Sequence, residues 1–163
     1  MITKQLCDCR YEYKNGVLYW KTSPSPKIKI GSPVGSLGKD GYFSTVVNYK
    51  RYFNHRLIFL MHHGYLPEYI DHINNIPTDN RIENLRKANK SENNYNSKLS
   101  FSNTSGAKHV YWNKKQKQWI VKLGVNKQIK YFGTFKDFEL AELVASEARN
   151  KYHKQFANDG ITI

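Results

Sequence analysis

Residues 68–97 read EYIDHINNIPTDNRIENLRKANKSENNYNS, and the order of elements within this stretch decides the fold. Its apolar residues are few and scattered, at Ile70, Ile73, Ile76, Ile82 and Leu85. A stretch so rich in Asn, Asp and Arg is held by side-chain hydrogen bonds as much as by burial. We therefore expect a compact ββα unit, in which one strand carries Asp71 and His72, a return strand spans 85–88 and a helix begins near Lys90.

The polar residues of this stretch follow a spacing that is more specific than an isolated Asp-His pair. The elements in order are Asp71-His72, Asp79-Asn80-Arg81, Asn84-Leu85 and Glu92-Asn93. Asn84 lies 12 residues after His72, and Asn93 lies 21 residues after it. This arrangement resembles the motif of the HNH nuclease family, in its phage and homing-endonuclease branch, where a DH pair is followed by DNR, NL and EN.

The resemblance implies a role for each of the main motif residues. Asp71 and Asn93 would be protein ligands of one divalent metal ion, and His72 would be the general base. Asn84 would form a hydrogen bond with His72 and fix its ring. Many family members have His where this chain has Asn93, so the next residue, Asn94, is an alternative ligand.

Two further matches support the motif. Asn80 and Arg81 correspond to the DNR element, for which the resemblance implies a structural hydrogen bond or a phosphate contact. The upstream segment His55-Arg56-Leu57 also resembles the family, and for His55 we expect a packing role.

The residue types suit the hydrolysis of a phosphodiester bond, which requires an activated water and stabilisation of negative charge. His72 has an ordinary pKa near 6.5, so it can take a proton near neutral pH. A carboxylate and an amide oxygen are hard ligands that suit Mg²⁺, with Mn²⁺ as the alternative, whereas structural zinc is disfavoured. Ligands for a single metal ion favour cutting one strand at a time.

The chain is strongly basic, which restricts its partners. It has 26 Lys and Arg against 13 Asp and Glu in 163 residues, a formal charge of +13. Double-stranded DNA is the expected partner, because each neutralised phosphate releases counterions. An anionic membrane is the rival, but the sequence offers no amphipathic basic helix or apolar span for it. No protein partner is evident.

The N-terminus shows no secretion signal, because Lys4, Asp8 and Arg10 interrupt any apolar run. We therefore expect the protein to work in the cytoplasm, which is the host's if a phage encodes it. Cys7 and Cys9 are the only cysteines and have no second pair. A zinc site would need distant His or acidic ligands, so two unpaired thiols are the simpler interpretation.

The sequence ahead of the motif predicts two hairpins and a helix. The hairpins span 11–20 and 42–53, with turns at Lys14-Asn15-Gly16 and Asn48-Tyr49-Lys50. Residues 55–63 are typical of a short helix that ends at Gly64. Residues 22–41 are rich in Pro and Gly, so we expect loop or irregular edge structure there.

The sequence after the motif predicts a linker and a second domain. Residues 98–105 are rich in Ser and Asn and show no sustained period, as in a linker. Three strands are expected beyond it, near 108–112, 117–124 and 129–133, followed by a helix over 137–152. We therefore divide the chain into a nuclease domain, a linker and a DNA-binding domain, at 1–97, 98–105 and 106–163.

The second domain resembles the AP2 DNA-binding domain over about residues 105–158. The residues that carry this likeness are Val110-Tyr111-Trp112, Lys117-Gln118-Trp119, Tyr131-Phe132-Gly133-Thr134-Phe135 and the Ala-rich helix. The resemblance implies that the outer face of a three-stranded antiparallel sheet contacts duplex DNA, with Tyr111, Lys115, Lys122 and Tyr131 as candidate contacts. Lysines stand where arginines commonly read guanine, so we expect phosphate affinity more than base specificity.

Charge supports the sheet as the DNA-binding surface. Residues 106–136 contain eight Lys and no Asp or Glu, whereas the helix after them holds most of the acids of this half. We expect an α+β protein that joins a ββα-metal nuclease domain to an AP2-like domain. The expected function is metal-dependent DNA cleavage, by a phage-encoded or homing enzyme. A non-catalytic DNA-binding regulator and an RNA-binding or nucleoid protein are the alternatives.

Overall fold

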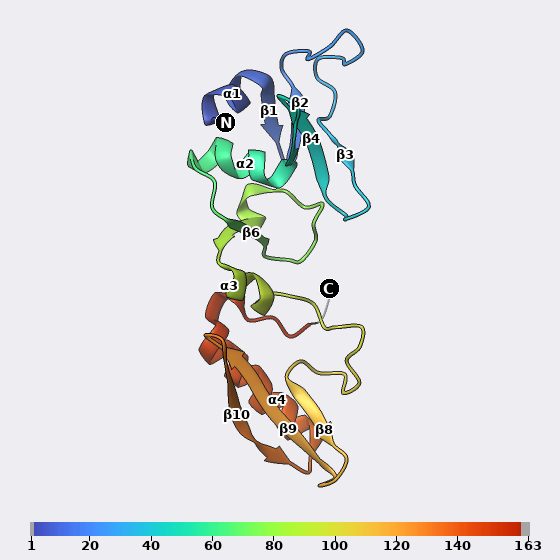
Figure 1. Ribbon diagram of the computed structural model, residues 1–163, viewed down its shortest axis with the longest axis vertical. Helices are drawn as coiled ribbons and strands as arrows, with labels where there is room; N and C mark the ends of the chain where they lie inside the picture. Colours follow the sequence, from blue (N-terminus) through green and yellow to red (C-terminus); the bar gives the residue numbers. More distant parts are fainter. Residues whose placement is uncertain (1, 161–163) are drawn as a thin grey trace. The chain divides into compact units, whose positions relative to one another are not determined.

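The computed structural model describes residues 2–160 and shows an α+β protein (Figure 1). The chain forms two compact units, Met1–Ala88 and Asn89–Ile163. Both units contain helices and both contain antiparallel strands, which confirms the predicted class. Within the described residues, none of the helices has the length and apolar character needed to cross a membrane.

The first unit begins with a short helix and a hairpin: α1 (Lys4–Arg10), β1 (Tyr11–Lys14) and β2 (Val17–Trp20). The predicted hairpin is confirmed, since Asn15 and Gly16 have φ angles of 47° and 86°, as a two-residue primed turn requires. The sequence does not predict α1, because seven residues are too few to show a helical period. Its one signal is Thr3, whose side chain accepts a hydrogen bond from the N–H of Leu6.

Residues 22–41 are largely loop, as expected, but they contribute one short strand. β3 (Ser36–Leu37) pairs with β4 (Phe43–Val47), and β4 pairs with β5 (Lys50–Phe53). The second predicted hairpin is thus confirmed. Helix α2 (Asn54–His63) follows directly and ends at Gly64, whose φ of 77° closes the helix in a left-handed cap.

Helix α2 forms the centre of the first unit's core. Its run of apolar residues from Leu57 to Met61 is buried, and residues of α1 and the β1–β2 hairpin pack against it. Cys7 of α1 belongs to this core, where burial raises the pKa of its thiol to about 11. Cys9 is exposed, and both cysteines are free, in agreement with two unpaired thiols.

The two strands of the predicted ββα unit also lie in the first unit. β6 (Tyr69–His72) and β7 (Leu85–Ala88) pair antiparallel, so that Asp71 lies opposite Arg86. A 3-10 helix, η1 (Ile82–Asn84), leads into β7. Only Asn89 separates β7 from α3 (Lys90–Tyr95), and it forms a capping box with Glu92 at the start of that helix.

The second unit is a three-stranded antiparallel sheet covered by one long helix (Figure 1). Its elements are β8 (Val110–Asn113), β9 (Gln118–Val125), β10 (Gln128–Phe135), α4 (Phe138–His153) and the 3-10 helix η2 (Lys154–Phe156). The strand order is β10-β9-β8. Val121 of β9 is buried with Ala141 and Ala145 of α4, so the predicted helix packs on the sheet.

The segment 98–105, expected as a linker, is bonded into the second unit. The side-chain oxygen of Asn103 accepts from the N–H groups of Ser105 and Gly106, at 3.1 and 2.7 Å. The Ser105 hydroxyl donates to the carbonyl of Ala107 at 2.9 Å. Short Ser and Asn side chains therefore fold this segment locally instead of leaving it extended.

Helix α3 is tied to the same unit. The ring of Tyr95 stacks on that of His153, with 3.6 Å between centroids. Lys108 Nζ donates to the Tyr95 carbonyl at 3.1 Å, and Asn158 Nδ2 donates to Asn96 Oδ1 at 3.2 Å. The compact units therefore divide between β7 and α3, within the ββα motif that the sequence places in a single domain.

Candidate active site

His72 ends β6 in a buried aromatic environment. It is 6% exposed, and the ring centroids of His55 and Tyr42 lie 5.0 and 5.9 Å from its own. His55, from the first turn of α2, stacks on Phe53 at 5.5 Å. The HRL segment thus supplies a ring that packs against the motif histidine.

Asn80 fixes the orientation and the tautomer of the His72 ring. His72 Nε2 and Asn80 Oδ1 are 3.0 Å apart, and both residues are buried. Because an amide oxygen only accepts, the neutral ring carries its hydrogen on Nε2 and its lone pair on Nδ1. The ring therefore offers Nδ1 as its proton acceptor.

Burial keeps the His72 ring neutral. It lowers the pKa of His72 below the ordinary 6.5, and the hydrogen bond with Asn80 and the carboxylate of Asp71 offset this only in part. A general base must be unprotonated to accept a proton. At pH 7 the imidazole is therefore in the form that such a role requires.

Asn84 does not pair with His72, in contrast to the hydrogen bond expected from the sequence. Its Oδ1 accepts from the N–H of Asn74 at 3.0 Å, and its Nδ2 donates to Asn74 Oδ1 and to the Asp79 carbonyl at 2.9 and 2.8 Å. The amide thereby closes the loop between β6 and β7. Asn80, within that loop, is the residue that reaches the ring.

The loop between β6 and β7 also contains an ion pair. Arg81 Nε and a terminal guanidinium nitrogen donate to the two oxygens of Asp79, at 2.8 and 2.7 Å. These bonds hold the pKa of Asp79 down to about 2. The side chain of Arg81 is 53% exposed, so its guanidinium is fixed in direction while it remains open to solvent.

The β1–β2 hairpin contacts this loop and supports it. The Tyr13 hydroxyl accepts a hydrogen bond from the N–H of Ile82 at 3.0 Å. A Cβ on Gly16 would lie 2.8 Å from the backbone nitrogen of Arg81, so the turn and the loop are in close contact. Nothing in the sequence indicates this contact, because some 65 residues separate the two segments.

The carboxylate of Asp71 is held by Arg86 from the neighbouring strand. Arg86 Nε and a terminal nitrogen each lie 2.7 Å from Asp71 Oδ2, and both side chains are largely buried. Sequence reasoning missed Arg86 as a site residue. Its signal was the strand register, which places residue 86 opposite residue 71 once the two strands pair.

The residues of the motif fit a hard divalent cation. Among residues 2–160, no group of three or more His, Cys, Asp or Glu could hold a metal ion, so a closed zinc-type cage is not built. The available donors are one carboxylate and Asn side chains, which suit Mg²⁺ because it retains several water ligands.

The candidate ligands Asn93 and Asn94 lie on α3, in the second unit. Asn93 is half-buried and Asn94 is exposed. Successive residues of a helix point about 100° apart, so only one of the two can face a given site. Their role as ligands stays a prediction.

Three of the four candidate DNA contacts share the outer face of the C-terminal sheet. Lys122 lies opposite Tyr131 in the register, and its ammonium group lies 4.5 Å from the ring centroid of Tyr111. Tyr111 and Tyr131 are 44% and 64% exposed. Lys115 lies instead in the turn between β8 and β9, where its N–H donates to Asn113 Oδ1.

The comparisons with known proteins agree with this site. A family model described as HNH endonuclease matches residues 52–95, from β5 to the end of α3. Protein 3.8 of Escherichia phage T7 is 38% identical over 91 residues, which make up 55% of this chain and 73% of that relative. The chain contains an HNH endonuclease domain and is a homologue of this phage protein. No solved structure matches it significantly. An HNH endonuclease domain implies DNA as substrate, and the family generally uses a divalent metal.

Gly16→Ala should destabilise the HNH domain more than Gly31→Ala. Both glycines have left-handed φ angles, 86° and 80°, but a Cβ at Gly31 would meet nothing within 4 Å. Each substitution costs about 1 kcal/mol in backbone strain, and Gly16→Ala adds roughly 1–3 kcal/mol by displacing Arg81. Urea denaturation measures both losses. Equal losses would contradict the support that we assign to the hairpin.

Acid should unfold the protein in part through His55. Burial lowers its pKa to about 3, so between pH 6.5 and 3 the unfolded chain binds a proton that the folded chain does not. Stability is therefore lost as the pH falls below 6.5. His55→Phe keeps the ring but not the titration, and we expect it to reduce the loss between pH 7 and 4.5 by about 2 kcal/mol. Parallel urea curves at the two pH values test this, and an unchanged loss would refute it.

Proposed function

We propose that this HNH family member is a metal-dependent DNA endonuclease that hydrolyses phosphodiester bonds in duplex DNA. One observation carries the proposal: a buried, neutral His72, held by Asn80 through Nε2, stands beside the carboxylate of Asp71. The similarity to a phage protein supports a phage-encoded enzyme, either an HNH nuclease or a homing endonuclease.

In the proposed reaction His72 removes a proton from the attacking water. Nδ1 carries the lone pair, and Asn80 stabilises the imidazolium that forms because its Oδ1 accepts from Nε2–H. His55 and Tyr42 pack against the ring, and its burial keeps the pKa low, so that the ring is neutral at pH 7. Asn84 and the Asp79–Arg81 pair hold the loop in place.

Asp71 and Asn93, or Asn94 in its place, would hold one divalent cation, most simply Mg²⁺ or otherwise Mn²⁺. When bound, the cation supplies charge neutralisation at the phosphate and at the leaving oxygen. Arg86 orients the Asp71 carboxylate through Oδ2. With one cation and one base, the proposed enzyme nicks one strand in each event.

The C-terminal unit is proposed to be an AP2-like domain that binds the DNA duplex with its sheet. Tyr111, Lys122 and Tyr131 present a cation between exposed aromatic rings, a combination suited to phosphate and sugar contacts. Lys115 would reach the backbone from the turn at the end of the sheet.

A second candidate is a non-catalytic DNA-binding regulator. The ion pair between Asp71 and Arg86 favours it, because the carboxylate proposed as a metal ligand already has a cationic partner. The two proposals differ in whether the chain cuts DNA.

Incubation of the full chain with supercoiled plasmid should give nicked circles in Mg²⁺ and none in EDTA. His72→Ala should lower the rate by about 10²–10⁴, the usual contribution of a general base. His62→Ala, at the exposed end of α2, is the matched control and should cut normally. Undiminished cutting by His72→Ala would remove His72 from the mechanism, and binding without cutting by the wild type would favour the regulator.

The same assay separates Asn80 from Asn84. Asn80→Ala should slow nicking even under conditions in which the variant remains folded, because it removes the partner of the ring. Asn84→Ala should lower the free energy of unfolding, because its amide makes three bonds within the loop. The reverse pattern would contradict the roles that we assign.

The proposed sheet surface is tested by Lys122→Gln in the full chain. We expect weaker binding to duplex DNA in EDTA and a salt dependence of log Kd that is smaller by about 0.9, the value for one phosphate contact. Lys151→Gln, on α4, removes the same charge away from the sheet and should leave both quantities unchanged. If the two variants behave alike, the sheet face is not the contact surface.

A further inference from the structure

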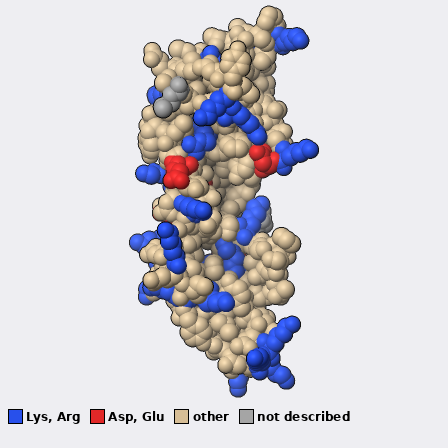
Figure 2. All heavy atoms as spheres, viewed as in Figure 1, with Lys and Arg blue, Asp and Glu red and all other residues tan. Residues whose placement is uncertain are grey.

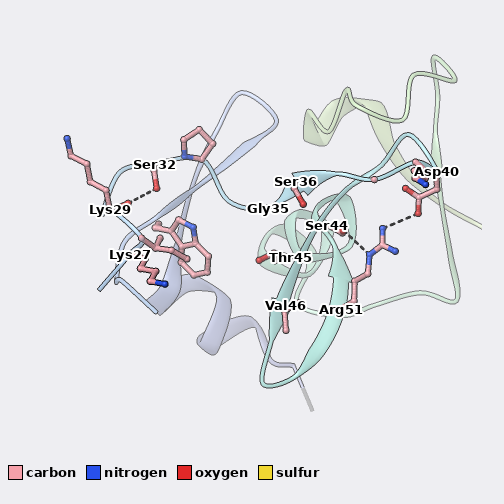
Figure 3. Close-up of a pocket in the computed structure, with 15 residues that line it drawn as sticks. Lys27, Lys29, Ser32, Gly35, Ser36, Asp40, Ser44, Thr45, Val46 and Arg51 are labelled. Carbon is pink, nitrogen blue, oxygen red and sulfur yellow. Dashed lines mark hydrogen bonds and ion pairs between the residues drawn. The ribbon is translucent and has the colours of Figure 1, made fainter. Parts of the chain in front are cut away.

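The first unit contains a broad groove that the proposed chemistry does not use. It has a volume of about 1070 Å³ and runs between the loop of residues 27–33 and the β3–β4–β5 sheet (Figure 3). Lys27 and Lys29 lie at one side of it, and Asp40 and Arg51 lie at the other. All of its lining residues belong to the first unit, so it is separate from the C-terminal sheet.

The charge of the groove is one-sided. Its basic residues are Lys27, Lys29, Lys39 and Arg51, whereas Asp40 is its single acidic residue. Asp40 is itself paired with Arg51, since the guanidinium lies 3.1 Å from its carboxylate. The net field in the groove is therefore positive, as a bound polyanion requires. Figure 2 shows that Lys and Arg are spread over one face of the molecule while acidic side chains are few there.

The floor and walls of the groove also carry donors for phosphate oxygens. Hydroxyl groups of Ser36, Ser44 and Thr45 line it together with the guanidinium of Arg51. Arg51 Nε donates to Ser44 Oγ at 2.8 Å, which fixes the guanidinium along the sheet. Hydroxyls and guanidinium groups are among the commonest partners of DNA phosphates.

Glycines make the wall of the groove thin. A Cβ on Gly38 would lie 2.5 Å from Asp40 Oδ1 and 2.9 Å from a terminal nitrogen of Arg51. On Gly35 it would lie 2.5 Å from the carbonyl oxygen of Ser44. A side chain at either position would displace the groups that line the groove, so its shape depends on these two residues.

One residue of the groove, Asp40, is linked to His72 through Tyr42. Asp40 lines the groove, and its Oδ1 accepts a hydrogen bond from the N–H of Tyr42 at 3.2 Å. The ring of Tyr42 is the one whose centroid lies 5.9 Å from that of His72. The groove and the proposed base therefore belong to the same unit and share a connected set of contacts.

We propose that this groove binds the sugar–phosphate backbone of duplex DNA to one side of the bond that is cut. It is a second DNA-binding surface, independent of the C-terminal sheet, and its contacts are Lys27, Lys29, Lys39 and Arg51. This inference rests on the proposed function, which supplies duplex DNA as the substrate. The groove would orient that duplex relative to His72. Because its contacts are to phosphate, the groove contributes affinity and register rather than base recognition.

Lys27→Gln/Lys29→Gln in the full chain tests the groove. Binding to a labelled duplex is measured in EDTA, from low to moderate salt. We expect the salt slope of log Kd to fall by roughly 2 and the affinity at 0.1 M salt to fall by roughly 10- to 100-fold, the effect of two lost phosphate contacts. Lys14→Gln/Lys21→Gln removes the same charge from the first unit outside the groove and should change neither quantity.

Lysine acetylation read by mass spectrometry locates the contact directly. Bound duplex should protect Lys27, Lys29 and Lys39 from the reagent, and Lys14 should react as it does in the free protein. Equal effects of the two double variants, or no protection in the groove, would overturn the proposal. If inorganic phosphate or a nucleoside triphosphate at equal charge protects these lysines and the duplex does not, the groove is a small-anion site and the proposal fails.

These outcomes are independent of cutting. A wild type that nicks plasmid while the groove variants bind normally would retain the proposed function and lose the groove. A wild type that does not nick, with groove variants that bind weakly, would retain the groove and lose the nuclease.

Discussion

The hydrogen bond between His72 and Asn80 is the constraint on which the first unit's architecture depends. It joins the end of β6 to the middle of the following loop, and it holds only if that loop has one shape. The loop obtains its shape from polar contacts: the amide of Asn84 closes it, and the ion pair of Asp79 with Arg81 stiffens its exposed side. Burial of an imidazole without such a partner would cost free energy, so the loop and the ring stabilise each other.

The apolar core of the first unit supports this polar loop. Helix α2 supplies a continuous run of buried residues to the core of the first unit, and its first turn places His55 against His72. The β1–β2 hairpin packs on the other side of the core and touches the loop through Tyr13 and Gly16. Elements far apart in the sequence therefore converge on a loop of about a dozen residues, which has little apolar surface of its own.

The sequence predicted most of the elements, and the reasons for its failures are physical. The hairpin at Asn15-Gly16 and helix α4 were predicted correctly, because a primed turn and a helical period are local sequence signals. The hydrogen-bond partner of His72 was not predicted correctly, because Asn80 and Asn84 are alike in chemistry and flank the same turn. Only the path of the backbone decides which amide reaches the ring. Arg86 could have been found from strand pairing, whereas the contact of Gly16 with residue 81 left no trace in the sequence.

The contacts of helix α3 limit how recombination could exchange the domains of such a protein. This helix carries the last element of the HNH motif, yet Tyr95 is stacked on His153 and Asn96 is bonded to Asn158, near the other end of the chain. A recombination event that replaced the C-terminal domain at residues 98–105 would remove the scaffold of that helix. The first unit and the C-terminal unit are therefore not interchangeable modules. They would have to be inherited, and to diverge, as a single unit.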